Sequence, residues 1–360
     1  MSDEWLWDPC VSHRATDAVN FVTNYFKAST RSTHLICGAG FDPRAAFFCG
    51  LLRDASTVSG TFFREERPNS SPELVCRAEH SCREMQKAIP NSTIESINVF
   101  ASDEAVIGGR EAVNTLVRGP LNDCTDVVID VSALSIGVAF PLIRYLLERS
   151  WETDGGFNVH VVSIDTPAVD QSIGSIAADR ADYVTGFRGT SGLHGRVDAV
   201  KLWLPHLVRD RHMVLEKLRV AIDPDDICPI LPFPCSQERQ SDELIEHYAA
   251  EFDGAWGIDT GNIIYADERN PIDLYRTILR IDDARKNVFA GVGGSELILS
   301  PAGSKALSIG AMMAAIERNF PVRYVETLSY TLDEESLDNL DCSYEKDLFH
   351  VWLSGDAYPS

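Results

Sequence analysis

Short runs of apolar residues alternate along this chain with longer segments in which apolar positions recur every three or four residues. The short runs are typical of buried strands and fall at residues 33–40, 56–63, 93–100, 126–130, 157–164, 261–265, 296–299 and 322–326. The longer segments predict amphipathic helices at residues 14–28, 72–88, 104–117, 137–148, 242–252, 272–281 and 304–318. Alternating strands and helices predict mostly parallel sheets with helices on both faces.

A chain of 360 residues suits two domains better than one. Residues 166–195 are rich in Gly, Ser, Thr and Asp, which is typical of a joint between domains. We therefore expect an α/β protein with two Rossmann-like domains, at residues 30–165 and 196–330. A helical arm over residues 1–29 and an acidic tail over residues 331–360 would flank them.

The chain is strongly acidic, with 54 Asp and Glu against 32 Lys and Arg and a formal net charge of -22. Nucleic acids are bound through basic surfaces, so we expect no direct DNA binding, and an anionic membrane would repel the chain as well. A small anionic ligand remains compatible with this charge, because a single pocket can be positive on a negative molecule. The acidic surface would otherwise serve solubility or bind a basic protein partner.

The chain contains nine cysteines and no C-x-x-C pair. Structural zinc sites usually combine two such close pairs, so we expect no metal centre. Cysteines within apolar runs, such as Cys37 and Cys49, are typical of reduced core residues and indicate a cytoplasmic location. The first residues have no signal-peptide pattern, and no apolar run reaches the length of about 18 residues that predicts a membrane span.

The best-marked candidate for ligand binding is the loop Ser-Pro-Ala-Gly-Ser-Lys at residues 300–305, between a predicted strand and a predicted helix. Free backbone N–H groups at the start of a helix attract anions. Gly303 would let an anion approach the backbone, and Lys305 would add a full positive charge. Ser300 and Ser304 would add hydroxyl groups. The alternative is a serine-capped helix with a surface lysine, and the loop lacks the Walker A pattern.

This loop resembles the ligand loop of CARF domains, the Rossmann-like sensors of cyclic oligonucleotides in prokaryotic CRISPR defence. The resemblance covers residues 296–318 and consists of a strand, Ser-x-x-Gly-Ser-Lys and a helix of small residues. It implies that Gly303, Ser304 and Lys305 contact the phosphate or ribose of a nucleotide-like ligand. It also implies a regulatory role in antiviral defence.

A second candidate loop, Gly-Ala-Gly-Phe-Asp-Pro-Arg at residues 38–44, follows the first predicted buried strand. Ligands of doubly wound sheets bind beyond the carboxyl ends of the strands. Gly38 and Gly40 would then admit a ligand close to the backbone, and Asp42 and Arg44 would bind its polar groups. The alternative is a structural turn with a local pair between Asp42 and Arg44.

The same loop resembles the Gly-Ala-Gly-x-Asp-x-Arg loop of one class of S-adenosylmethionine methyltransferases, which carry Thr where this chain has Pro43. The resemblance implies an acid at the end of the second strand that holds the ribose. Glu65 and Glu66 lie about where that strand is expected to end. The residue pattern by itself leaves the identity of any cofactor unknown.

Two weaker candidates follow other predicted strands. Asp130 and Ser132 lie at the end of a central strand, where the carboxylate either faces a pocket as an acid–base group or caps the next turn. Arg188 belongs to a loop at residues 186–195 that is rich in Gly, Ser and His. That loop suits anion capture by a lid, or it is a plain linker.

The pentapeptide Ala-Leu-Ser-Ile-Gly occurs at residues 133–137 and again at residues 306–310. Two related Rossmann-like units would explain it, and so would chance. The chain has no Gly-x-Ser-x-Gly elbow and no His-Glu-x-x-His motif. Its nine histidines are dispersed, so spacing selects no catalytic set.

Three functions are compatible with these patterns. The first is a sensor or regulatory protein that binds a nucleotide-like anion. The second is an enzyme that carries out group transfer or hydrolysis on a nucleotide-type substrate, or uses S-adenosylmethionine, with Asp42 or Asp130 as the acid–base group. The third is an interaction subunit without a ligand.

Overall fold

The computed structural model describes residues 5–55, 57–119, 121, 124–152, 156–189, 199–338, 340 and 343–358. The chain forms two compact units, which we call unit 1 (Met1–Ile176 and Thr327–Ser360) and unit 2 (Ala177–Glu326). Unit 2 is therefore inserted into the sequence of unit 1. The sequence predicted a single joint within residues 166–195, and the chain in fact passes between the units twice.

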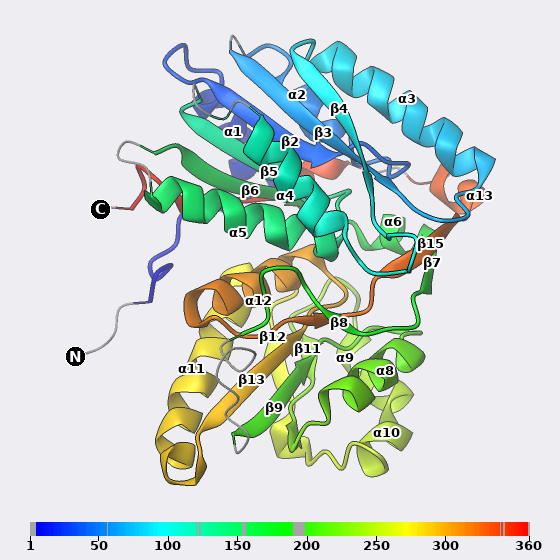
Figure 1. Cartoon of the computed structure of the whole chain (residues 1–360), viewed down its shortest axis with the longest axis vertical. Coiled ribbons are helices and arrows are strands. Elements are labelled where there is room, and N and C mark those ends of the chain that lie inside the picture. Colours follow the sequence, from blue (N-terminus) through cyan, green and yellow to red (C-terminus); the bar gives the residue numbers. More distant parts are fainter. Residues whose placement is uncertain are drawn as a thin grey trace. The chain divides into compact units, whose positions relative to one another are not determined.

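Unit 1 is built on a mostly parallel sheet of seven strands in the order β1–β16–β6–β5–β2–β3–β4 (Figure 1). The five strands from β6 to β4 are parallel, β16 is antiparallel to β6, and β1 is antiparallel to β16. Their bounds are β1 (Ser12–Arg14), β2 (Thr33–Gly38), β3 (Val58–Glu66), β4 (Ser92–Asn98), β5 (Asp126–Asp130), β6 (Asn158–Ile164) and β16 (Leu348–Ser354). The strand β2 thus lies between β3 and β5 at the centre of the sheet.

Helices cover both faces of the unit 1 sheet (Figure 1). One face carries α1 (Ala15–Tyr25), α2 (Phe47–Leu52) and α3 (Pro72–Ala88), whose buried residues form one apolar cluster with the sheet. The other face carries α4 (Gly108–Arg118) and α5 (Ile136–Glu152), which pack on each other. The predicted start of α3 is confirmed, because the Ser71 hydroxyl accepts a hydrogen bond from the backbone of Leu74 and Pro72 lies in the first turn.

Residues 12–25 and 348–354 belong to unit 1 as elements of its sheet and its helical cover, which corrects the predicted arm and tail. In the arm, β1 joins the sheet and α1 buries Ala18 and Val22. The predicted tail begins within β15 (Thr327–Leu332) and continues through α13 (Glu334–Asp338) and the 3-10 turn η3 (Tyr344–Asp347) to β16, in which all seven residues are buried. The acidic residues lie ahead of β16, and they concealed the apolar run that follows.

Unit 2 contains short strands that form a three-stranded parallel sheet and separate two-stranded ladders. β10 (Asp226–Ile227) and β13 (Ser295–Ser300) pair with opposite sides of β9 (Val200–Pro205), and β11 (Ile230–Pro232) pairs with β12 (Ile264–Ala266). Single parallel bridges connect His206 with Ile230 and Leu299 with Val322, just before β14 (Arg323–Tyr324). These pairings and bridges place β9 between β13 on one side and β10 and β11 on the other. β12 lies beyond β11, and β14 lies beyond β13. β14 also pairs with β8 (Asp182–Tyr183).

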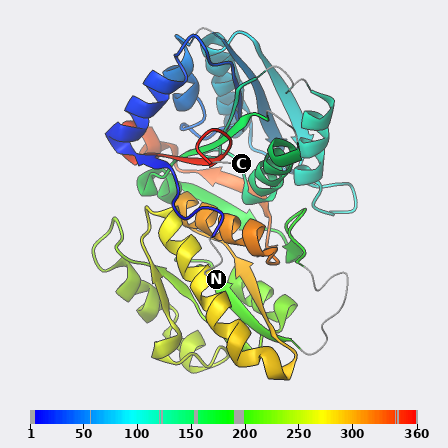
Figure 2. The same ribbon diagram turned by 90° about the vertical axis from the view of Figure 1, so that its left-hand side faces the viewer.

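Helices flank the unit 2 strands as well. An apolar cluster that includes Trp203 and Ile298 joins the strands to α8 (His212–Ile222), α9 (Gln240–His247) and α10 (Ala249–Asp253). The long helices α11 (Pro271–Phe289) and α12 (Lys305–Arg318) pack on each other, as Figure 2 shows. The turns η1 (Thr260–Asn262) and η2 (Ala290–Val292) complete the unit.

The two passages between the units lie in paired strands. β7 (Ile173–Ala177), which follows α6 (Pro167–Ser172), pairs with β15 in a two-stranded ladder.

None of the helices in the described part of the chain combines the length and the apolar character needed to cross a bilayer.

The role of β16 as an inner strand can be tested with Val351→Asp. Val351 is 0% exposed, so the substitution buries an unpaired carboxylate and should lower the free energy of unfolding by about 3 kcal/mol or more, measured by urea denaturation. The control is Val117→Asp on the outer face of α4, where Val117 is 60% exposed and the effect should be small. Equal stability of both variants and the parent would mean that residues 348–354 are a tail.

Candidate functional site

The carboxyl ends of β2, β3 and β5 meet at one edge of the unit 1 sheet, which we call the carboxyl edge of unit 1. The chain leaves β2 toward β3 on one side, whereas β5 lies on the other side. Strand order reverses at this point, and such reversals are where ligands of open α/β sheets bind. Both candidate loops of unit 1, at residues 38–44 and 130–135, lie here.

These two loops are in direct contact. A Cβ atom on residue 38 would lie 2.4 Å from the carbonyl oxygen of Ala133, so only glycine fits at Gly38. The backbone N–H of Ala39 donates a 2.7 Å hydrogen bond to Phe63 on β3. Gly40 is different, because a Cβ there would meet no described atom within 4 Å. The turn is therefore anchored at Gly38 and has open space at Gly40.

Asp130 is the chemically distinctive residue of this edge. Its side chain is fully buried, and its Oδ1 accepts hydrogen bonds from the Ser132 N–H (2.9 Å) and hydroxyl (2.5 Å). Its Oδ2 has no partner among the described residues, and neither has the hydroxyl of Ser135. Burial raises the pKa of Asp130 to about 6, although the hydrogen bonds from Ser132 oppose the shift. A carboxyl group with such a pKa can exchange a proton near neutral pH.

Asp42 and Arg44 form the local pair that was one of the two interpretations of their loop. Arg44 donates two hydrogen bonds to the carboxylate of Asp42, at 2.9 and 2.7 Å, and one to Asp170 at 2.8 Å. Burial by itself lowers the pKa of Arg44, but the two carboxylates hold it well above its ordinary value. Asp42 is thus fully engaged with a cation, which makes it a poorer acid–base candidate than Asp130.

Glu65 links β3 to the loop after β5. One carboxylate oxygen accepts a 2.8 Å hydrogen bond from the N–H of Ser135, and the other accepts one from Arg67 at 2.7 Å. Arg67 also donates to the carbonyl of Thr327 and lies over the ring of Tyr330. Glu65, rather than Glu66, therefore lies at the carboxyl edge.

Negative charge dominates this edge. It gathers the carboxylates of Asp42, Glu65, Asp130 and Asp170 and the guanidinium groups of Arg44 and Arg67. Four acids against two cations leave an excess of two negative charges when all are ionised. Such a site favours ligands that donate hydrogen bonds or carry positive charge over phosphorylated ones.

In unit 2 the loop at residues 300–305 joins β13 to α12. The Ser300 hydroxyl accepts a 2.9 Å hydrogen bond from the indole N–H of Trp203. The Ser304 hydroxyl caps α12 by accepting from the N–H of Leu307 (3.1 Å), and it donates to the carbonyl of Glu268 (3.0 Å). Both hydroxyls thus stabilise the fold, as the serine-capped alternative predicts. Their contact with a ligand stays a prediction.

The other two candidate residues of this motif lie just before the helix and at its first position. Gly303 is exposed and has a φ of 81°, a left-handed conformation that favours glycine. Lys305 is the first residue of α12 and is half-buried. Gly303 is thus the exposed residue of this loop, just ahead of α12.

His206 is a residue of this region that sequence reasoning missed. It follows β9, and its Nδ1 donates a 3.2 Å hydrogen bond to the carbonyl of Ala302. Its Nε2 is buried and has no partner in the described part of the chain. Burial lowers the pKa of His206 to about 4, although the bond to Ala302 opposes the shift. Only the pairing of β9 with β13 brings this histidine to the Ser300 loop, and spacing along the chain does not reveal that pairing.

Arg188 belongs to unit 2 and is exposed. The preceding residue, Phe187, accepts a 2.9 Å backbone hydrogen bond from Val322. The rest of the predicted lid loop, at residues 190–195, lies outside the described residues. Across the described ranges, no three or more His, Cys, Asp or Glu side chains are grouped so that they could hold a metal ion.

No protein-family model matches the chain, and no curated protein matches it in sequence.

The contact at Gly38 can be tested with a matched pair of substitutions two residues apart. Gly38→Ala should lower the free energy of unfolding by about 1–3 kcal/mol, because the new methyl group meets the rigid backbone of Ala133. Gly40→Ala should be neutral or slightly stabilising, since its methyl group has room. Urea denaturation measures both, and equal effects of the two substitutions would contradict the close contact of the loops.

A second pair tests the opposite electrostatics at the two ends of β5. The unfolded chain ionises Asp130 near the ordinary pKa and the native state only near 6, so native stability is lost as pH rises from about 4 to about 6. Asp130→Asn removes the charge and should raise the free energy of unfolding at pH 7.5 by up to about 3 kcal/mol. The gain should shrink at pH 4.5.

Asp126→Asn is the matched control. Burial raises the pKa of Asp126, but hydrogen bonds from His160, Thr125 and Asn158 hold it below its ordinary value. Replacing Asp126 should therefore lower stability at pH 7.5. Destabilisation by Asp130→Asn at pH 7.5 would contradict the raised pKa of Asp130.

Proposed function

We propose that unit 1 binds a ligand of the S-adenosylmethionine type at its carboxyl edge and that the protein is a group-transfer enzyme. The observation that carries the proposal is two buried oxygens without partners, Asp130 Oδ2 and Ser135 Oγ, in the loop whose Ala133 packs against Gly38. Buried polar atoms are rarely left without a hydrogen bond, so such a pair supports a missing partner.

The charge of the site supports a ligand without phosphates. Asp130 and Glu65 can accept hydrogen bonds from ribose hydroxyls, and the excess of negative charge favours an ammonium or sulfonium group. A nucleoside triphosphate would bring its own negative charge against four carboxylates. The position of Glu65 at the end of β3 also agrees with the ribose-holding acid that the methyltransferase resemblance implies.

Asp130 would act as the acid–base group of the transfer. Its pKa of about 6 keeps a substantial fraction of the carboxylate ionised at neutral pH, ready to accept a proton from a substrate hydroxyl or amine. The same burial makes the ionised form costly to the fold, and a residue that destabilises the fold is typical of a functional position.

The second candidate function is a sensor that binds a nucleotide-like anion in unit 2, as the CARF resemblance implies for prokaryotic antiviral defence. It is favoured by the exposed Gly303 at the start of α12, with Lys305 next to it and the unpartnered Nε2 of His206 on the neighbouring strand end. The parallel pairing of β13 with β9 also supports a second Rossmann-like unit, in which the candidate loop at residues 300–305 follows one of the parallel strands.

A thermal-shift panel separates the two candidates. S-adenosylmethionine and S-adenosylhomocysteine at 100 times their dissociation constants should stabilise the protein by about 2.7 kcal/mol, whereas ATP and cyclic oligoadenylate should have little effect. Asp130→Asn and Glu65→Gln should weaken the response to the adenosyl ligands, and Lys305→Ala should leave it unchanged.

The opposite pattern would overturn the proposal. Stabilisation by cyclic oligoadenylate or ATP that is lost in Lys305→Ala favours the sensor in unit 2. No response to any of the four ligands removes both candidates.

A further inference from the structure

Four titratable side chains form a continuous hydrogen-bonded chain across unit 1, away from the carboxyl edge. They come one each from four adjacent strands: Asp126 from β5, His160 from β6, His350 from β16 and His13 from β1. His160 Nε2 lies 3.2 Å from Asp126 Oδ1, His350 Nε2 lies 2.9 Å from His160 Nδ1, and His13 Nδ1 lies 3.0 Å from His350 Nδ1. This series of hydrogen bonds runs from the middle of the sheet to its edge.

Three of the four groups are sealed from water. The side chains of Asp126, His160 and His350 are 0% exposed, and His13 is half-buried at the outer end. Phe21 of α1 stacks on the rings of His13 and His350, with centroid distances of 4.3 and 4.4 Å. The aromatic cover surrounds the four linked side chains with a low-dielectric environment, in which hydrogen bonds are strong and charges are costly.

The hydrogen bonds fix the protonation of every ring. An ionised Asp126 can only accept, so His160 Nε2 must donate and His160 Nδ1 must accept from His350 Nε2. His350 Nδ1 then accepts from His13 Nδ1. This order leaves His13 Nε2 as a free acceptor, and no hydrogen bond from another described residue reaches it.

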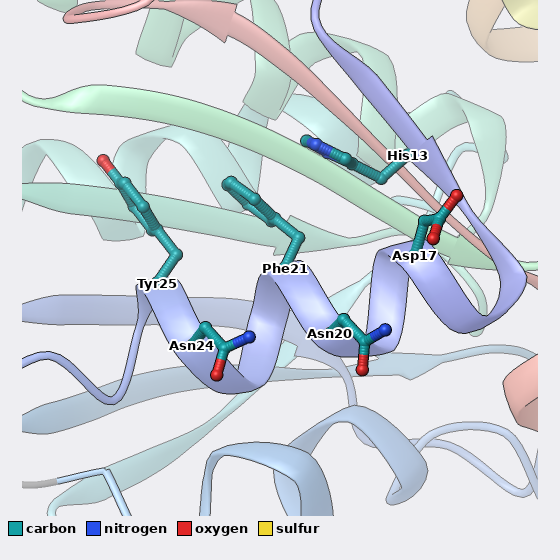
Figure 3. Close-up of a pocket in the computed structure, with 6 residues that line it drawn as sticks. All are labelled: His13, Asp17, Asn20, Phe21, Asn24 and Tyr25. Atoms are coloured by element: carbon teal, nitrogen blue, oxygen red, sulfur yellow. The ribbon is translucent and has the colours of Figure 1, made fainter.

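His13 Nε2 belongs to a side chain that lines an open surface groove of about 530 Å³ along α1 (Figure 3). In Figure 3, His13, Phe21 and Tyr25 extend toward the strands, whereas Asn20 and Asn24 lie on the outer side of the helix. Asp17 is the only charged residue of the lining besides the titratable His13, so the groove suits a neutral or cationic small molecule.

We propose that His13, His350, His160 and Asp126 form a proton relay, in which His13 Nε2 takes a proton from a neutral or cationic O–H or N–H acid in the α1 groove. The proton enters at His13 Nε2, the Nδ1 proton of His13 moves to His350 Nδ1, and the Nε2 proton of His350 moves to His160 Nδ1. No electrons move, and His160 becomes an imidazolium paired with the Asp126 carboxylate. Asp126 stays ionised, as the carboxylate of a catalytic triad does. Reversal of the same steps returns the proton to the groove.

The surroundings of the relay support this end point. Asp126 is held by further donors, because Tyr25 donates to its Oδ1 at 3.1 Å and Asn158 at 2.9 Å. Burial lowers the pKa of all three histidines, so they are neutral near pH 7 and hold an added proton only weakly, while Asp126 opposes the shift at His160 and Asp17 opposes it at His13. The titratable and charged groups that face the relay are Asp17 and Tyr25 on α1, Arg31 after α1, and Asp356 after β16.

Nitrogen-15 NMR of the full chain labelled at histidine tests the relay, with the proton itself as the probe. At pH 7.5, His160 and His350 should carry their proton on Nε2 and His13 on Nδ1. As pH falls, the three histidines should respond in one shared transition. Either His160 or His350 with its proton on Nδ1, or three independent transitions, would overturn the proposal.

Variants separate a relay from a merely structural cluster. His350→Gln can still form hydrogen bonds but cannot pass a proton, so uptake at His13 should move to lower pH by about one unit or more and His160 should stop responding. The control His34→Gln removes another buried histidine of unit 1, bonded to Ser59 and Thr61, and should leave the shared transition intact.

His13→Gln provides a second test, since this residue is at the half-buried outer end and its replacement should leave unit 1 folded. The shared transition should disappear from His350 and His160. Its persistence in this variant, or an unchanged His13 titration in His350→Gln, would show that no proton passes along the chain.

Discussion

The position of β2 between two parallel neighbours is the constraint on which unit 1 depends. Pairing with β3 and β5 brings three strand ends to one edge and presses the turn at Gly38 against the backbone of Ala133. That contact leaves no room for a side chain, and it places Asp130 deep enough for burial to raise its pKa. Two residues further along the turn, a side chain at Gly40 would meet open space. The candidate site is therefore a product of strand order, with the acid–base chemistry of Asp130 as its consequence.

Strands and helices with strong periodicity were predictable from the sequence. The run at 126–130 and the capped helix at 72–88 agree with β5 and α3 to the residue, because each combines an unbroken local pattern with clear end signals. β16 was missed since its apolar residues follow an acidic segment. The shared pentapeptide also misleads, because Gly137 is the second residue of α5 whereas Gly310 is the sixth of α12, so the two copies are not in equivalent positions.

The candidate sites were only partly predictable, and the reason is the same in both units. Gly38, Asp130 and Ser300 carry local signals, a glycine turn or a polar residue after an apolar run. Ser135, His206 and the relay of His13, His160 and His350 carry none. Their roles come from strand neighbours that are up to 337 residues apart in the chain. Spacing along a sequence contains no information about such neighbours until the sheet order is known.

The insertion of unit 2 into unit 1 has a consequence for the order in which the protein is made. All residues of unit 2 emerge during synthesis before β16, which is the partner of both β6 and β1. Until those last residues appear, β6 is an edge strand with unpaired backbone groups, and such edges promote association between chains. All of unit 2 is thus synthesised before the sheet of unit 1 can be completed, and an exposed strand edge in that interval is a hazard for folding.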